Sequence, residues 1–159
     1  MNRIHFFIAP LLFLLLITPP AIKAAEQSNY KGWERESEYN QMYDYKERDS
    51  LKGSITKFKK IVPLPGMAPG TAFIIKEGDD EILVHLCPWE FASPKQSGIQ
   101  TGVKTKVKGS WAVIDDQDVF IAAKVKQGEH FEFKVRLTRD GTPFWTMSPE
   151  ELAREQQPE

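Results

Sequence analysis

Residues 130–137 read His-Phe-Glu-Phe-Lys-Val-Arg-Leu, and this stretch decides the fold class. Its odd-numbered residues are all apolar and its even-numbered residues are all polar. A period of two is typical of an antiparallel strand with one buried face and one solvated face. The stretch therefore predicts a sheet protein in which the polar side chains face solvent, namely His130, Glu132, Lys134 and Arg136.

Five further runs carry the same signal, at residues 51–62, 71–76, 81–86, 103–113 and 119–125. In the run 103–113 the alternation predicts an inward set of Val103, Val107, Trp111 and Val113, and an outward set of Lys104, Lys106 and Lys108. In the run 119–125 it predicts an inward set of Val119, Ile121, Ala123 and Val125. These expectations assume that each strand keeps its alternation from end to end.

Turn residues connect these runs into a compact sheet. Gly78-Asp79-Asp80 and Asp115-Asp116-Gln117-Asp118 are hairpin signals, and Pro63 stops the first strand. Gly53 and Gly109 lie inside strands, where glycine often marks a bulge that lets a short sheet curl. The pattern predicts an all-β fold, a small OB-like antiparallel barrel of five to six strands. Residues 87–102 contain Pro88, Pro94 and Gly98, so we expect a loop or one short turn there.

The chain divides into four segments. Residues 1–24 combine a positive start, a short apolar run and small residues, which predicts a signal peptide and a periplasmic protein; the run is too short for a permanent membrane helix. Residues 25–50 form a polar arm rich in aromatic residues. Residues 51–147 form the barrel domain. Residues 148–159 begin with a capping box, Ser148-Pro149-Glu150-Glu151, which predicts a short helix through about Glu155.

Charge and cysteine content exclude some classes of function. The expected signal holds Arg3 and Lys23, so the mature chain keeps 19 basic residues against 22 acidic ones, a net charge of −3. Bulk charge therefore does not favour nucleic-acid binding. Cys87 is the one cysteine, so no internal disulfide can form, and burial is its expected state.

A series of short motifs resembles a known family. In chain order they are Trp33, Tyr39-Asn40, Tyr43-Asp44, Lys52-Gly53-Ser54-Ile55, Pro65-Gly66-Met67 with Gly70, Val84-His85-Leu86 with Pro88, Val107-Lys108-Gly109-Ser110, Ile121-Ala122-Ala123 and 139–145 (Arg-Asp-Gly-Thr-Pro-Phe-Trp). This order resembles small exported bacterial proteins with an OB-like barrel, which include magnetosome-associated periplasmic proteins and domains found beside multihaem cytochromes. The resemblance implies a fold and a compartment. The chain departs from it at Cys87, where the family pattern has glycine, and it has no Cys-x-x-Cys-His motif for a c-type haem.

His85 and Cys87 are the sharpest candidates for chemistry. On a regular strand they project from one face, opposite Ile82, Val84 and Leu86. Imidazole and thiolate suit copper or zinc, but two ligands are too few, and His130 is the only other histidine of the mature chain. A Cys–His nucleophile would also need an orienting group that the sequence does not mark. We predict no resident cofactor and keep the metal- or thiol-dependent site as an alternative.

Lysines on neighbouring strands form a second candidate. Lys104, Lys106 and Lys108 with Lys124 and Lys126 could line a basic stripe that, with Trp111, Phe120 or Trp89, would suit single-stranded nucleic acid. A solvated face that resists aggregation is the competing interpretation, and export and negative net charge favour it. Oligonucleotide binding stays as a second alternative.

The aromatic arm is the third candidate. Tyr39, Met42 and Tyr43 share one face at helical spacing, and we expect the arm to pack its rings on the barrel rather than on a partner. Residues that could contact a partner or ligand are Trp33, Tyr39, Tyr43, His85, Trp89 and Trp145. Because no catalytic set is assembled, we expect a non-catalytic periplasmic accessory module that binds an envelope protein or a small ligand, in redox or metal handling.

Overall fold

The computed structural model describes residues 29–155. The expected signal peptide, residues 1–24, lies outside the described residues. The described chain holds six strands, as the sequence predicts: β1 Arg48–Ile61, β2 Gly70–Glu77, β3 Asp80–Pro88, β4 Lys104–Ile114, β5 Gln117–Gln127 and β6 Phe131–Lys134. Its helical elements are short: α2 Glu38–Gln41, α3 Pro94–Ser97, the 3₁₀ turn η1 Phe144–Thr146 and α4 Pro149–Glu155.

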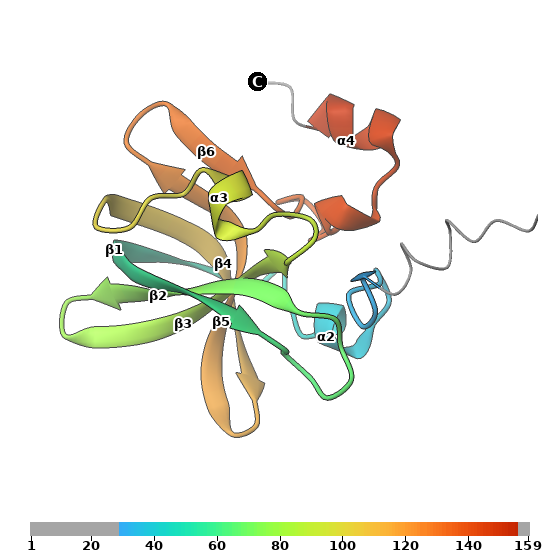
Figure 1. Cartoon of the computed structure of the whole chain (residues 1–159), viewed down its shortest axis with the longest axis horizontal. Coiled ribbons are helices and arrows are strands. Elements are labelled where there is room, and N and C mark those ends of the chain that lie inside the picture. Colours follow the sequence, from blue (N-terminus) through green and yellow to red (C-terminus); the bar gives the residue numbers. More distant parts are fainter. Residues whose placement is uncertain (1–28, 156–159) are drawn as a thin grey trace, which may run out of the picture.

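The strands form one sheet that closes in a ring (Figure 1). Their order is β3-β2-β1-β4-β5-β6, and all consecutive pairs are antiparallel. A short parallel pairing of β3 with β5 joins the two sides, with Val84 opposite Phe120 and His85 opposite Ile121. β6 extends the sheet beyond β5 and lies outside the five-stranded ring. The prediction of an all-β, OB-like fold is confirmed, as a five-stranded ring with a sixth strand at its edge.

Hairpin turns and a curled first strand allow the closure. Asp115 and Asp116 both have positive φ, 50° and 59°, which is the geometry of a two-residue turn that matches strand twist. β1 pairs with β4 through Ser54 and then with β2 from Ser54 onward, so it turns the corner of the ring. A Cβ on Gly53 would collide with the carbonyl oxygen of Lys76 at this corner, so the position requires glycine.

A bulge changes the predicted faces of β5. The register shifts between Lys108 and Gly109, so Ala123 has no partner opposite it and the alternation of β5 reverses there. Trp111 of β4 lies opposite Phe120 and contacts its ring, so β4 keeps its predicted face, but Trp111 and Val113 are 41% and 63% exposed. In β5 the expected inward residues are all buried, but three of them contact the arm rather than the interior of the ring, namely Val119, Ile121 and Ala123.

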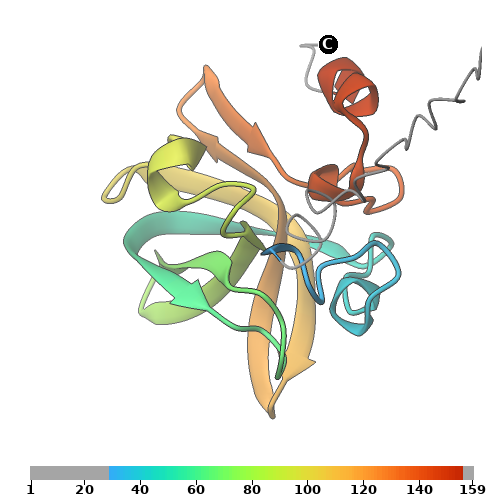
Figure 2. The same ribbon diagram turned by 45° about the vertical axis from the view of Figure 1, so that its right-hand side comes forward.

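Two apolar clusters hold the fold together. The ring core fills the interior of the sheet and includes Phe73, Leu86, Phe120 and Val125. Ala92 and Ile99 join it from residues 89–103, which carry the one-turn helix α3 across the ring as Figure 2 shows. The arm core lies on the outer side of β5 and includes Trp33, Tyr39 and Tyr43. β5 is therefore buried on both sides over much of its length.

Both ends of the described chain meet on the same side of the ring (Figure 1). The arm, residues 29–47, wraps against β5 and the loop before β2, and η1 and α4 follow β6 onto the same region. The predicted capping box is present, because Ser148 Oγ accepts from the amide of Glu151 while a Glu151 carboxylate oxygen accepts from the amide of Ser148. α4 ends at Glu155, as predicted.

Candidate functional site

The aromatic rings of the arm are buried against the sheet. Trp33, Tyr39 and Tyr43 are at most 6% exposed. Trp33 donates from its indole nitrogen to the carbonyl of Ala68 at 2.8 Å, and its own carbonyl accepts from the indole of Trp145 at 2.7 Å. The packing interpretation of the arm holds for these rings, so in this conformation they offer little surface to a partner.

Arg136 lies at the centre of this contact and is 1% exposed. Its guanidinium is sandwiched between the rings of Tyr43 and Trp145, with 4.9 Å to each ring centroid. It donates to Asn40 Oδ1 at 2.7 Å and weakly to the carbonyl of Gly141 at 3.4 Å. None of its contacts in the described residues is to a carboxylate, so the rings and two neutral oxygens offset the burial of the charge.

The burial of Arg136 corrects the sequence prediction, which placed it in solvent. The paired part of β6 ends at Lys134, and the amides of Val135 and Arg136 both donate to the carbonyl of Ala123, at 2.8 and 3.1 Å. Two consecutive amides on one acceptor interrupt the alternation, so Val135, Arg136 and Leu137 are all buried. The sequence holds no signal for this, because it depends on the arm covering the outer face.

Burial leaves two polar atoms without partners at the contact between the arm and the segment after β6, which we call the seam. Arg136 Nε and the hydroxyl of Tyr43 are both buried and have no hydrogen-bond acceptor or donor within reach. Burial raises the pKa of Tyr43, so its hydroxyl stays protonated and able to donate. Both residues line a surface pocket of about 360 Å³ together with Asn40 and Gly141.

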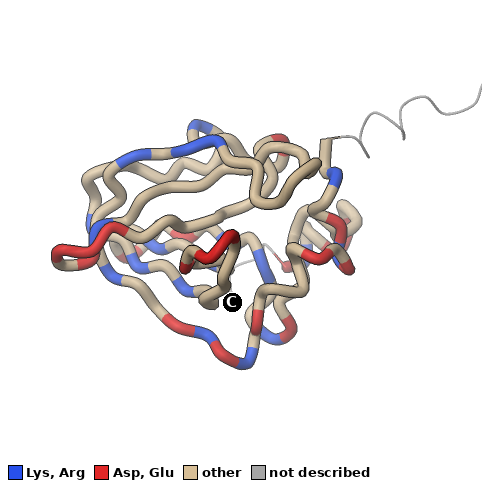
Figure 3. The backbone as a smooth tube through the Cα atoms, turned by 90° about the horizontal axis from the view of Figure 1, so that it is seen from below, with Lys and Arg blue, Asp and Glu red and all other residues tan. Residues whose placement is uncertain are grey.

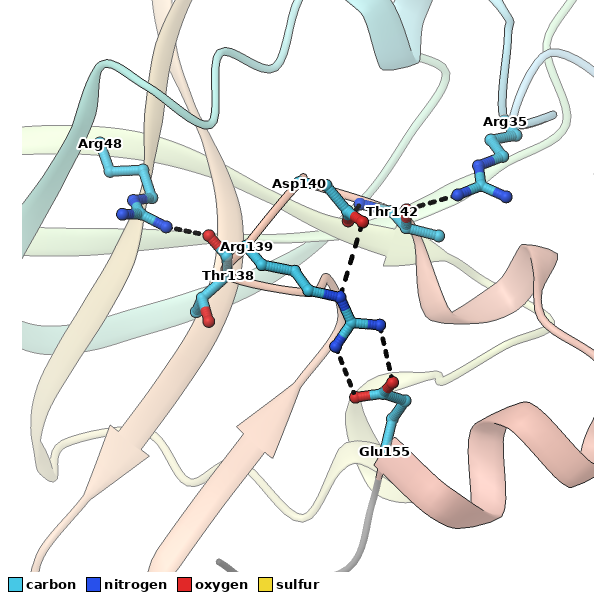
Figure 4. Close-up of polar contacts among 7 residues, drawn as sticks. All are labelled: Arg35, Arg48, Thr138, Arg139, Asp140, Thr142 and Glu155. Atoms are coloured by element: carbon cyan, nitrogen blue, oxygen red, sulfur yellow. Dashed lines mark hydrogen bonds and ion pairs between the residues drawn. The ribbon is translucent and has the colours of Figure 1, made fainter.

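The turn 138–142 forms one wall of this pocket and is fastened on several sides (Figure 4). Arg35 donates to Thr142 Oγ1 at 2.7 Å, and Arg48 donates to the carbonyl of Thr138. Arg139 makes a bidentate contact with Glu155: its two terminal nitrogens donate to the two carboxylate oxygens at 2.8 and 3.3 Å. This contact connects the turn to the end of α4. These contacts join the turn to the arm, to β1 and to α4.

His85 and Cys87 do not form the joint site that a regular strand would make. The register between β2 and β3 shifts so that Thr71 faces Cys87 and Ala72 faces His85, which leaves Leu86 without a partner. Cys87 therefore joins Leu86 in the ring core and donates to the carbonyl of Ala92, whereas His85 Nδ1 lies 3.3 Å from the hydroxyl of Tyr39. The expectation of a shared face was wrong because of this bulge.

Burial governs the chemistry of both groups. It raises the pKa of the Cys87 thiol well above its ordinary range, so the reactive thiolate is disfavoured. It lowers the pKa of His85 to about 4, so the imidazole is neutral at pH 7. His130 is exposed in the β5–β6 turn. Among residues 29–155 no three metal-ligating side chains gather into a group that could hold an ion.

The remaining tryptophan candidates lie nearer the surface. Trp145 is half-buried and, with Trp33 and Phe91, lines an open groove of about 850 Å³ beside α4. Trp89 is also half-buried, and the ammonium of Lys60 lies 4.6 Å from its ring centroid. The structure thus separates the six predicted contact residues into a buried group and two partly exposed rings.

Lysines do form a basic face across four strands. In the sheet register Lys52 of β1 faces Lys106 of β4, which faces Lys126 of β5. In the next row Lys108 of β4 faces Lys124 of β5, which faces Lys134 of β6. Figure 3 shows the basic positions recurring along neighbouring strands. We call this the basic face, made of Lys52, Lys104, Lys106, Lys108, Lys124, Lys126 and Lys134.

Two adjoining hollows run along the basic face. One has a volume of about 540 Å³ and lies among Arg48, Lys108 and Lys124. The other has a volume of about 840 Å³ and extends from Lys124 and Lys126 past Lys134 to Arg139 and Arg154. Lys124 and Thr138 line both hollows, and we refer to the two hollows together as the groove. Glu132 lines the larger hollow and lies within 3.4 Å of three lysine ammonium groups, those of Lys124, Lys126 and Lys134.

The ring and its basic face fall within a recognisable family region. A family model described as the MamS/MamX magnetosome protein family matches residues 47–132. The chain belongs to this family. The MamS/MamX match spans the strands from β1 into β6, so the ring and six of the seven lysines of the basic face lie inside it. The arm, Arg136 and α4 lie outside it. Membership indicates a non-catalytic accessory role.

Other comparisons add little to the MamS/MamX assignment. No curated protein matches the chain. Among solved structures, one similar chain comes from "Structure and Conformational Change of a Replication Protein A Heterotrimer Bound to ssDNA", with 11% identity and a TM-score of 0.40. That match covers 52% of this chain and 58% of the other. Within residues 29–155 no helix is both long and apolar enough to cross a bilayer.

Proposed function

We propose that this MamS/MamX family member is an exported, non-catalytic accessory module that binds an acidic protein segment along its basic face. The setting that we propose is the periplasm, where the module would assist envelope redox or metal handling. The observation that carries the proposal is the register of β1, β4, β5 and β6, which places lysines side by side on four adjacent strands.

Like charges that face each other directly across strands destabilise a sheet. Three such lysine pairs face each other between β4 and its neighbouring strands: Lys52–Lys106, Lys106–Lys126 and Lys108–Lys124. Glu132 relieves part of the repulsion, but it reaches only the lysines of β5 and β6. A bound carboxylate-rich chain would relieve the remaining repulsion between the lysines. Its carboxylates could do so while they stay exposed to solvent.

The groove suits an acidic protein better than a nucleic acid. Phe144 is the one aromatic residue that lines the two hollows, and it is 1% exposed, so the groove presents no ring on which a base could stack. Acidic groups also interrupt it, namely Asp49, Glu129, Glu132 and Glu155. These carboxylates interrupt the positive charge of the groove, which disfavours an evenly spaced phosphate backbone relative to an acidic protein segment whose carboxylates can be spaced to avoid them.

The test compares two triple variants of equal charge. Lys108→Gln, Lys126→Gln and Lys134→Gln together neutralise the groove, and Lys57→Gln, Lys59→Gln and Lys95→Gln together neutralise exposed lysines elsewhere. A fluorescent oligoglutamate peptide serves as the probe. We expect the wild type and the control to bind it, with affinity falling steeply as salt rises from about 50 to about 200 mM, because the contact is charge-driven.

The groove variant should lose about tenfold or more in affinity. Equal losses in the two triple variants would show that net charge rather than the basic face attracts the peptide, and the proposal would then fail. The binding of a single-stranded oligonucleotide is measured in parallel. If the protein binds the oligonucleotide more tightly than oligoglutamate, the partner is a nucleic acid and the proposed acidic protein is wrong.

A further inference from the structure

The seam between the arm and β6 has features of a ligand site that is separate from the basic face. Arg136 is fully buried, carries a charge, and contacts only two neutral oxygens and two rings in the described structure. Its Nε has no acceptor, and the hydroxyl of Tyr43, on the ring stacked against it, has no partner. Native proteins rarely leave two neighbouring buried donors unused.

The two residues that carry these donors line one pocket. The pocket of about 360 Å³ is lined by Tyr43 and Arg136, by Asn40 and Gly141, which accept hydrogen bonds from Arg136, and by Thr142. Arg35 and the turn 138–142 brace its rim (Figure 4). The site is thus assembled from the arm and from the segment after β6, neither of which is in the matched family region.

We propose that this pocket binds a small monocarboxylate, which accepts hydrogen bonds from Arg136 Nε and from the Tyr43 hydroxyl. A carboxylate has two oxygens, one for each donor, and its charge would neutralise the buried guanidinium. The stacked rings of Tyr43 and Trp145 already fix the plane of the guanidinium, so little side-chain freedom is lost on binding.

The rim argues for a singly charged ligand. Glu36 and Asp140 line the pocket together with Arg35 and Arg136. Their carboxylates would repel phosphate, which carries more negative charge at pH 7, more strongly than a monocarboxylate.

The experiment follows the Arg136 Nε–H signal of ¹⁵N-labelled protein by NMR. Because this group is buried, its proton exchanges slowly with water and the signal can be observed. We expect saturable movement of the signal when sodium acetate is added and no movement with matched sodium chloride. Sodium phosphate should move it far less. Absence of a saturable shift with acetate, or an equal response to chloride, would overturn the proposal.

Tyr43→Phe separates a ligand-binding hydroxyl from a merely structural one. The variant keeps the ring that stacks on Arg136 but removes the unpartnered hydroxyl. We expect acetate to bind about tenfold more weakly, because a hydrogen bond to a charged group is lost. Tyr45→Phe is the control, since Tyr45 lines the same pocket but is 37% exposed. It should change the affinity less than twofold.

Thermal unfolding gives an independent readout. Without acetate, Tyr43→Phe should unfold at the same temperature as the wild type or higher, because it no longer buries an unsatisfied hydroxyl. Saturating acetate should raise the unfolding temperature of the wild type above that of the variant. If acetate raises both temperatures equally, the Tyr43 hydroxyl does not contact the ligand and the proposed geometry is wrong.

Discussion

His85 and Arg136 show at the residue scale how burial decides the state of an ionisable group. Arg136 keeps its charge because two rings and two neutral oxygens surround it, although burial lowers its pKa. His85 has only the hydroxyl of Tyr39 within hydrogen-bond reach and is 3% exposed. Burial lowers the pKa of His85 to about 4, so the neutral imidazole fills its site.

This difference predicts a pH dependence of stability. The unfolded chain binds a proton at His85 below a pH of about 6.5, whereas the folded protein does so only near pH 4. Between these values the unfolded state holds more protons, so the free energy of unfolding rises with pH. The contribution of His85 to the free energy of unfolding is fully present above a pH of about 6.5, and it falls by roughly 3 kcal/mol as the pH drops to about 4.

His85→Gln should flatten that part of the profile, because an amide can still bond to Tyr39 but does not titrate. The measurement is urea unfolding between pH 4 and pH 7, analysed as the difference between variant and wild type. His130→Gln, in an exposed turn, is the control and should leave the profile unchanged. A wild-type profile retained by His85→Gln would contradict the assignment.

At the scale of the element, bulges set which side chains face the core. The shift opposite Lys108 and Gly109 reverses the alternation of β5, and the shift between Thr71 and Ala72 separates His85 from Cys87. Glycine marks the first of these in the sequence, but the residues around Leu86 carry no such mark. A period of two therefore identified the strands correctly and assigned several of their faces incorrectly.

Gly109→Ala tests the close approach opposite the β5 bulge. A Cβ at this position would collide with the carbonyl oxygen of Ile121 and with the ring of Phe120. Because the collision is with backbone in the ring core, we expect a loss of about 2–3 kcal/mol in the free energy of unfolding, measured by urea titration. Lys106→Ala, on the exposed face of the same strand, should stay within about 0.5 kcal/mol of the wild type.

At the scale of the whole molecule, the arm packs on the ring and shares a buried core with it. The rings of the arm cover Val119, Ile121 and Ala123 of β5, which would otherwise expose apolar surface. Trp33 also bridges Ala68 and Trp145, which lie 35 and 112 residues further along the sequence. The arm is thus part of the folded core rather than an appended tail.

Trp33→Ala should therefore destabilise the entire protein. Trp33 is completely buried, so we expect a loss of about 3–5 kcal/mol and one cooperative unfolding transition that far-UV and near-UV circular dichroism report at the same urea concentration. Trp89→Ala removes a half-buried ring and should cost clearly less. Separate transitions for arm and ring would show that the two fold independently.

The sequence by itself determined the number and position of the strands, the hairpin turns and the capped helix that ends at Glu155. These features depend on local alternation, turn chemistry and capping, which are contained in a few neighbouring residues. The lysine stripe was also visible, although its cross-strand register was not.

Only the tertiary structure decided the burial of Arg136, the separation of His85 from Cys87 and the pocket beside Tyr43. Each depends on contacts between segments far apart in the chain: the arm covers an outer face of the sheet, and a shifted register in one strand pair turns side chains over. Alternation fixes which residues share a face, but what covers that face is set by the packing of the whole chain.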